Sequence, residues 1–271
     1  MKKYVLAGCG NRGLYAYAKP IVAQYGDCAQ LVGLYDINPK RCAYAGALLG
    51  GIPCYDSFDR MLSDTRTDVL IITTIDKFHS EYAVRALDAG VDVICEKPMV
   101  KDDVQCRALI EAEKRTRRKI AVTFNCRFIP YIVRLKELMR EGVVGKVLNV
   151  DFEWSLDTSH GADYFRRWHR KLENCGGLLV HKATHHFDIV NWLIGQEPET
   201  VYATGSLDYY GCDRRMHARR CSECAENCEL RYRGAADPHI RALYFDCEDA
   251  DSYFRDRCVF DGEIDIYDTM S

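Results

Sequence analysis

The chain has 271 residues, 48% of them hydrophobic, and a formal net charge of −3 at pH 7. This length suits one large domain or two ordinary ones, with enough apolar residues to fill their cores. The slightly acidic balance argues against sequence-independent binding to nucleic acid or to anionic lipid, because both need a basic surplus.

The N-terminal residues are predicted to form the first strand of the fold and not a targeting segment. Lys2 and Lys3 lead directly into a predicted strand, and no run reaches the about 18 apolar residues of a membrane span. We therefore expect a cytoplasmic protein whose partners are small molecules, without a membrane or nucleic-acid role.

The first half of the chain alternates short β-branched apolar runs with longer amphipathic stretches, which is typical of βαβ units. The pattern predicts strands over residues 3–7, 30–35, 69–74, 91–95 and 120–125, and helices over residues 12–25, 39–49, 78–89 and 102–115. Pro20 should bend the first helix or divide it in two. We expect an α/β fold with a doubly wound parallel sheet of Rossmann type over residues 1–124.

The pattern changes beyond residue 124. It predicts a helix to about residue 140, a long alternating strand over 146–156, longer loops, and an alternating run over 258–267. Another strand should begin just after that run, where the chain ends. We expect residues 125–271 to form a C-terminal α+β domain for substrate binding and oligomerisation, with a mainly antiparallel sheet that a truncation leaves incomplete.

A glycine-rich loop follows the first predicted strand and opens the first helix. It reads Gly8-Cys9-Gly10-Asn11-Arg12-Gly13, a G-x-G-x-x-G pattern. Glycines there let the backbone turn tightly and approach a pyrophosphate, whose charge meets free N–H groups at the start of the helix. Because the strand and helix context is present, we interpret all of these residues except Cys9 as cofactor-binding.

Asp36 closes the second predicted strand, roughly 20 residues past the glycines, where a carboxylate accepts hydrogen bonds from adenosine ribose hydroxyls. A 2′-phosphate would meet like charge there, so NAD is favoured over NADP, although Lys40 or Arg41 could soften that preference. The alternative is that Asp36 merely caps the helix that begins at Pro39.

Further motifs carry a family resemblance. In chain order they are His79 after Thr73-Thr74, Glu96-Lys97-Pro98, Phe124-Asn125-Cys126-Arg127-Phe128 with Pro130, and Gly176-Gly177-Leu178-Leu179 leading to His185 and Asp188. Behind this glycine loop the combination resembles the Gfo/Idh/MocA family, named for glucose-fructose oxidoreductase and inositol dehydrogenase. The resemblance covers the chain from end to end.

The resemblance implies an NAD(P)-dependent dehydrogenase that transfers hydride between nicotinamide and a hydroxyl of a sugar, sugar acid or polyol. It places Lys97 beside the nicotinamide and the reacting hydroxyl, with His185 as acid or base. A neutral imidazole can take the alcohol proton while the ammonium steadies the alkoxide. It also implies a homo-oligomer, a dimer or tetramer, for the full-length protein.

Other site residues follow from the same resemblance. Cofactor contacts are expected from Thr74, His79, Glu96, Lys97 and Asn125, and substrate contacts from Arg127, Trp168, His181 and His185. His79 could instead be an ordinary helix-start residue, and the loop around Trp168 could be a solvated segment with one anchoring tryptophan.

His181 departs from the family pattern. The family commonly has aspartate four residues before the catalytic histidine, on the same helix face, and this chain has His181. We expect His185 to be a weaker base or to use another partner, and His181 to join the catalytic group. Two other functions stay open: an NAD-dependent glycosidase that oxidises its sugar transiently, and a dinucleotide-binding sensor without catalysis.

The chain has 14 cysteines, which a reducing compartment would keep as thiols or metal ligands. Cys221, Cys224 and Cys228 are close enough in sequence to share one tetrahedral ion, with further cysteines available as a fourth ligand. This spacing predicts a structural zinc site, with free or disulfide-paired thiols as the alternative.

Overall fold

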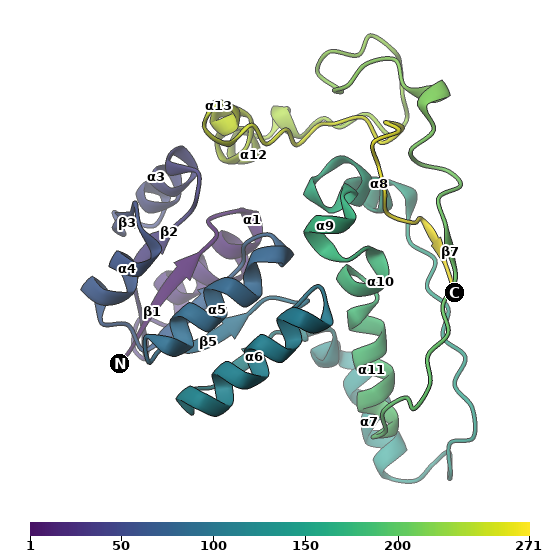
Figure 1. The fold of residues 1–271 in the computed structure, drawn as a ribbon, viewed down its shortest axis with the longest axis horizontal. Helices are drawn as coiled ribbons and strands as arrows, with labels where there is room; N and C mark the ends of the chain where they lie inside the picture. The colour runs from purple at the N-terminus through teal and green to yellow at the C-terminus, as the bar shows by residue number, and fades with distance from the viewer.

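A computed structural model describes residues 1–271, residue 214 excepted. Its N-terminal half contains a six-stranded sheet in the order β3-β2-β1-β4-β5-β6, with every pair parallel (Figure 1). The strands are β1 (Lys2–Ala7), β2 (Ala29–Tyr35), β3 (Cys54–Tyr55), β4 (Val69–Ile72), β5 (Asp92–Cys95) and β6 (Ile120–Val122). This order confirms the predicted Rossmann-type sheet and places the carboxyl ends of β1, β4 and β5 together.

Helices cover both faces of this sheet. One face carries α4 (Phe58–Thr65), α5 (His79–Asp88) and α6 (Asp103–Thr116), and the other carries the first helix and α3 (Pro39–Leu48). Successive strand residues serve opposite faces: Val5 packs with the first group and Leu6 with the second. A strand buried on both faces is apolar throughout, which is why these runs were readable in the sequence.

The first helix is irregular where the sequence predicted a break. It consists of α1 (Asn11–Gly13), a π-helical segment η1 (Leu14–Ala18) and α2 (Lys19–Gln24). Pro20 has no N–H to donate to the carbonyl one turn earlier, and the amide of Lys19 donates instead to Leu14 O. The helix therefore continues past the proline through a wider turn.

Sequence patterns missed the short elements between β2 and β4. Strand β3 has two residues, too few for a period to show, and α4 follows directly, with the Ser57 hydroxyl accepting from the amide of Arg60. Ser57 is a standard N-terminal cap. In the sequence, Ser57 was therefore the residue that could have predicted the start of α4.

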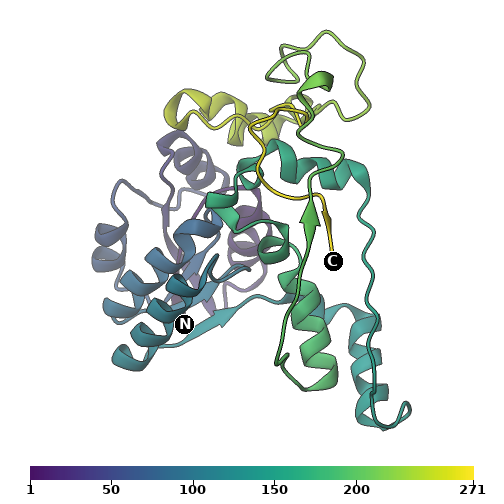
Figure 2. The same cartoon turned by 45° about the vertical axis from the view of Figure 1, so that its right-hand side comes forward.

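Most of the regular structure in the second half is helical. After the 3-10 turn η3 (Asn125–Phe128) come α7 (Pro130–Arg140), α8 (Thr158–Arg166), η4 (Trp168–Arg170), α9 (Leu172–Cys175), α10 (Leu178–His181), α11 (Thr184–Ile194), η5 (Asp213–Arg215), η6 (Gly234–Ala236), α12 (Pro238–Leu243), η7 (Phe245–Cys247) and α13 (Glu248–Asp251). A two-stranded antiparallel sheet joins β7 (Gly205–Ser206) to β8 (Thr269–Met270), near the C-terminus in Figure 2. The short antiparallel sheet agrees with the predicted fold class.

The strand predicted over 146–156 is wrong. Those residues, all of which the structure describes, form neither helix nor strand, and Leu148 is 87% exposed. A strand needs a neighbour to take up its backbone hydrogen bonds. In the described part of the chain, the antiparallel pairing of named strands is limited to β7 and β8.

One segment of the second half returns to the first. Both views show α12 and α13 beside α3 (Figures 1 and 2), and Leu243 and Tyr244 pack into the core on that face of the sheet. Among the described residues, no helix has the length and apolar character needed to cross a bilayer.

Candidate functional site

The glycine loop packs directly against the end of β4. Gly8 has a φ of +95°, and a Cβ there would lie 2.7 Å from the carbonyl carbon of Thr73. A Cβ on Gly13 would lie 2.3 Å from Gly8 O. Only glycine fits at these two positions, so the loop is the tight, close-packed cradle that a pyrophosphate site requires.

The amide of Asn11, the first residue of the helix, already has a partner in the structure. Its N–H donates to the hydroxyl of Tyr244, 2.8 Å away and 233 residues further along the chain. The same hydroxyl would lie 3.2 Å from a Cβ built on Gly10. A side chain from the second half of the chain therefore reaches into the glycine cradle.

Asp36 is buried at the end of β2 and touches the same loop. Its carboxylate accepts from the amides of Cys9 and Asn38, both at 2.8 Å, and pairs with Arg41 at 3.0 Å. Burial raises the pKa of Asp36, and Arg41 opposes that rise. Asn38, and not Asp36, caps the helix at Pro39, because its side chain accepts from the amides of Lys40 and Arg41. The capping alternative for Asp36 is therefore wrong.

Lys97 follows β5 and points at the histidine-bearing helix α10. Its ammonium donates to the backbone oxygen of His181 at 3.0 Å. Burial lowers the pKa of Lys97, while the carboxylates of Asp76 and Glu96 work to raise it. The structure thus brings together Lys97 and His181, which the sequence proposed for the same chemistry.

His181 is paired with a carboxylate that sequence reasoning missed. Its Nδ1 lies 2.5 Å from Oδ2 of Asp76, which precedes α5 and is 2% exposed. Burial raises the pKa of Asp76 and lowers that of His181. One proton lies between the two atoms, and when it is on Nδ1 the ring is neutral and its Nε2 is an acceptor.

His185 is the second histidine of the site and lacks such support. Its Nδ1 is buried without a hydrogen-bond partner among the described residues, and its ring lies edge-on to Phe124. Burial, together with the positive charges of Lys97 and Lys182, lowers the pKa of His185 to about 4. Among the described residues, His185 therefore has no carboxylate to orient its ring.

His79 and Glu96 are both buried, and both tie loops together. The His79 ring nitrogens lie 2.8 Å from Pro98 O and 3.1 Å from Thr74 O, which links the loops after β5 and β4. Glu96 accepts from Arg12 Nε and from the Tyr17 hydroxyl, both at 2.6 Å. These contacts hold the Lys97 segment against the glycine helix.

The remaining predicted residues lie around this centre. Arg12 and Asn125 line one hollow of about 470 Å³ beside the first helix and β6. Arg127 forms a two-pronged ion pair with Asp188. Trp168 stacks on His169 with ring centroids 3.6 Å apart and meets His181 edge-on. Trp168 therefore lies against His169 and His181, and the Arg127 side chain is paired with Asp188.

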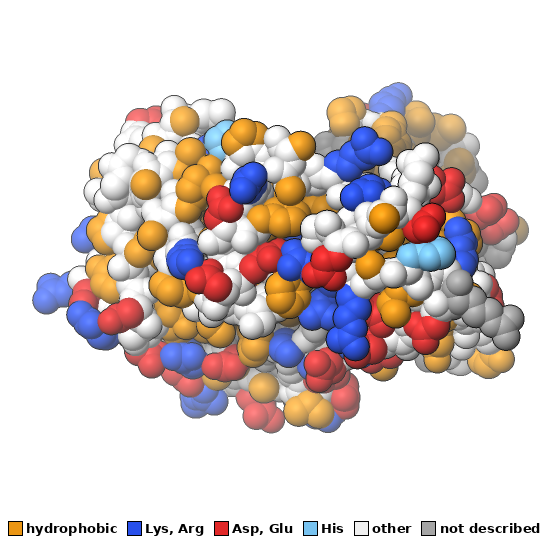
Figure 3. Space-filling model, turned by 90° about the horizontal axis from the view of Figure 1, so that it is seen from above, with side chains coloured by type: hydrophobic (Ala, Val, Ile, Leu, Met, Phe, Trp, Pro, Cys, Tyr) orange, Lys and Arg blue, Asp and Glu red, His pale blue; other side chains and the backbone are white. Residues whose placement is uncertain are grey.

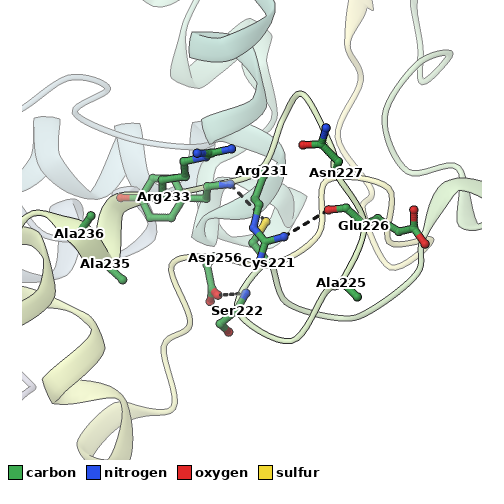
Figure 4. Close-up of a pocket in the computed structure, with 11 residues that line it drawn as sticks. Cys221, Ser222, Ala225, Glu226, Asn227, Arg231, Arg233, Ala235, Ala236 and Asp256 are labelled. Carbon is green, nitrogen blue, oxygen red and sulfur yellow. Dashed lines mark hydrogen bonds between the residues drawn. The ribbon is translucent and has the colours of Figure 1, made fainter.

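The structure does not support the predicted zinc site. In the part of the chain that the structure describes, no three Cys, His, Asp or Glu side chains are arranged to hold a metal ion. The Cys221 sulfur instead accepts from the amide of Tyr232 at 3.4 Å, beside a hollow of about 590 Å³ lined by Arg231 and Asp256 (Figure 4). Among the described residues, these three cysteines therefore do not form a group that could hold zinc.

Comparison with known proteins identifies the family. Residues 2–124 match the Gfo/Idh/MocA description "Oxidoreductase family, NAD-binding Rossmann fold", and residues 136–232 match its "C-terminal alpha/beta domain". The chain belongs to the Gfo/Idh/MocA oxidoreductase family, as its motifs predicted.

Individual relatives are longer than this chain. YteT of Bacillus subtilis (strain 168) is 37% identical over 99% of this chain and 68% of its own length. An inositol 2-dehydrogenase of Rhizobium meliloti is 28% identical over 76% of this chain and 58% of its own. The structure of the WlbA dehydrogenase from Bordetella pertussis, in complex with NADH and UDP-GlcNAcA, matches with a TM-score of 0.66 at 28% identity, covering 76% of this chain and 63% of WlbA. The chain thus spans between 58% and 68% of the length of these relatives.

Sequence reasoning missed Asp76 and Tyr244. Asp76 follows Thr73-Thr74 at the carboxyl edge of the sheet, so its position was a usable signal. Tyr244 gave no local signal, because its relation to the glycine loop depends on how a distant segment docks.

Proposed function

We propose that this protein binds NAD along the glycine loop and Asp36 and transfers hydride to or from a hydroxyl of a polyol or sugar. The observation that supports this most strongly is the meeting of Lys97 and His181 at the carboxyl edge of the sheet, with Nζ 3.0 Å from His181 O. The inositol 2-dehydrogenase relative and the NADH complex of WlbA support the same reaction class.

The dinucleotide would be held by the loop amides at Gly10, Asn11 and Gly13, with Asp36 near its adenosine ribose. Its nicotinamide supplies the hydride acceptor or donor. We place the boundary between the cofactor-binding and substrate-binding domains near residue 125. NAD is preferred to NADP, because a 2′-phosphate would meet the Asp36 carboxylate.

The proton of the reacting hydroxyl passes to His181. Asp76 holds Nδ1 of that ring, which orients the imidazole and stabilises the charge it gains when Nε2 takes a proton. Lys97 stabilises the developing alkoxide. His185, which lacks a carboxylate partner among the described residues, positions the substrate and is a secondary base.

A turnover assay tests the proposal. The chain is incubated with NAD and a panel of inositols, hexoses and uronic acids, and NADH is followed by absorbance. The proposal expects NADH formation with at least one neutral or acidic sugar, abolished by Lys97→Met. Cleavage of a glycoside without net NADH would instead indicate a glycosidase. NAD binding with no turnover of either kind would indicate a binding protein.

A further inference from the structure

The segment 238–251, here called the strap, contains α12 and α13 and docks on the Rossmann domain over the face that carries α3. It belongs to the second half of the sequence, yet Leu243 and Cys247 are buried on docking, at 0% and 2% exposure. Seen from above, basic and acidic side chains are interspersed over this side of the molecule (Figure 3). The docked strap is held by apolar burial and by the ion pairs of Lys40 with Asp249 and of Arg41 with Asp251.

Tyr244 is the strap residue that enters the dinucleotide cradle. Its hydroxyl accepts from Asn11 N–H at 2.8 Å, and its side chain is clamped by the Arg255 guanidinium, 4.2 Å from the ring centroid. An amide of the glycine loop can serve a phosphate oxygen only when it is free to donate. Tyr244 occupies that donor.

The strap also engages the two cations beside Asp36. Lys40 pairs with Asp249 at 2.6 Å, and Arg41 pairs with Asp251 at 2.8 Å while donating through Nε to Leu243 O at 2.9 Å. The Arg41 pair is largely buried and the Lys40 pair is exposed, so the Arg41 contacts contribute more to docking.

A third contact comes from the helix cap. The Asn38 side chain, fully buried, donates to Cys247 O at 2.9 Å while its oxygen caps α3. The loop that carries Asp36 is therefore tied to the strap through both Asn38 and Arg41. Docking and the shape of the ribose site are coupled.

We propose that the strap gates the dinucleotide site. When docked, Tyr244 holds the Asn11 amide, and Asp249 and Asp251 hold Lys40 and Arg41. The strap must lift before a dinucleotide phosphate can take the Asn11 donor. This inference rests on the proposed function for the identity of the ligand, and it adds a conformational step before binding.

Calorimetric titration with NAD tests the competition. Tyr244→Phe removes the hydroxyl that occupies Asn11 and keeps the ring, and Asp251→Asn removes the buried pair with Arg41 from the strap side. Both variants should bind NAD about three- to tenfold more tightly than the unchanged chain, because closing the strap then stabilises the empty state less. Asp246→Asn is the matched control: this strap carboxylate pairs with Arg241 of the strap itself, so affinity should stay the same.

Hydrogen exchange gives an independent readout. Adding NAD should increase amide exchange over residues 238–251. Unchanged or weaker NAD affinity in both variants, or a strap that becomes more protected with NAD, would overturn the gate while leaving NAD binding established. Absence of NAD and NADP binding in the unchanged chain and in both variants would instead overturn the proposed function together with the gate.

Discussion

Asp76 Oδ2 lies 2.5 Å from His181 Nδ1, although 105 residues separate them in sequence. The loop after β4 supplies the carboxylate, and α10 supplies the imidazole. The family commonly has aspartate where this chain has His181, so the carboxylate–histidine pair is present here with its members on different elements. His185, four residues on, has no such partner among the described residues. The pairing is the reason we assign His181, backed by Asp76, as the principal base.

Asp76→Asn should lower kcat by about 100-fold, because Asp76 orients the His181 ring and stabilises the positive charge that the ring gains. KM and NAD affinity should change little, because Asp76 does not contact the substrate. The pH profile of kcat should shift as well, and Asp76→Glu should restore part of the rate. Steady-state kinetics across pH measure all three effects. Glu81→Gln is the control, since that carboxylate forms an exposed pair with Arg85 on α5. Equal losses in both variants would contradict the role of Asp76.

Acid should destabilise the fold through its buried histidines. Burial lowers the pKa of His185 to about 4 and also lowers the pKa of His169. An unfolded histidine binds its proton near pH 6.5, so below about that pH the unfolded state holds more protons. The free energy of unfolding is therefore largest above about pH 6.5. Between about pH 6.5 and pH 4 it falls by up to about 1.4 kcal/mol per pH unit for each such histidine.

Urea unfolding at about pH 7.5 and about pH 5 measures this loss. His185→Phe should reduce it, because one of the titrating rings is gone and the ring-to-ring contact with Phe124 is kept. The same substitution at His160, which is exposed, should leave the loss as it was. A pH dependence that His185→Phe does not change would show that His185 is protonated equally in both states.

The glycine loop should be intolerant of a single added methyl group. Gly13→Ala would place a Cβ 2.3 Å from Gly8 O, so the loop must shift. We expect about 1–3 kcal/mol of lost stability, the usual cost of overpacking, together with loss of NAD binding. Gly26→Ala is the control, because its Cβ would meet only Val22 O at 4.0 Å. Denaturant unfolding measures the stability of both variants. Equal stability would show that the glycine loop can shift to accommodate the added methyl group at little cost in free energy.

Much of the Rossmann domain was predictable because its signals are local. Strand runs such as 69–72 are apolar on both faces, and the glycine loop has a fixed spacing between a strand and a helix. Asp36, the candidate ribose acid, and Lys97 each follow a strand at the carboxyl edge, where ligands of such sheets bind. The sequence therefore located the candidate site and named the reaction class through family motifs.

The remainder depends on contacts between distant segments. Nothing near Tyr244 indicates that its hydroxyl meets Asn11, and nothing near His181 indicates Asp76. The strand predicted over 146–156 failed because alternation shows which side chains share a face but not whether a neighbouring strand pairs with them. The zinc prediction lacks support for a similar reason: spacing along the chain does not fix where three sulfurs lie in space.

Calorimetric titration of the chain with NAD and NADP, repeated on Asp36→Asn, measures whether the glycine loop and Asp36 bind the cofactor. Asparagine keeps only one of the two acceptors, because the Cys9 and Asn38 amides donate to different oxygens of Asp36, so urea unfolding of the variant is measured beside the titration. We expect the chain to bind NAD more tightly than NADP. In the variant, NAD affinity should fall roughly tenfold or more, because the charged hydrogen bond from Asp36 to the ribose is lost. Absence of binding to either dinucleotide by the folded, unchanged chain would contradict the proposed NAD site.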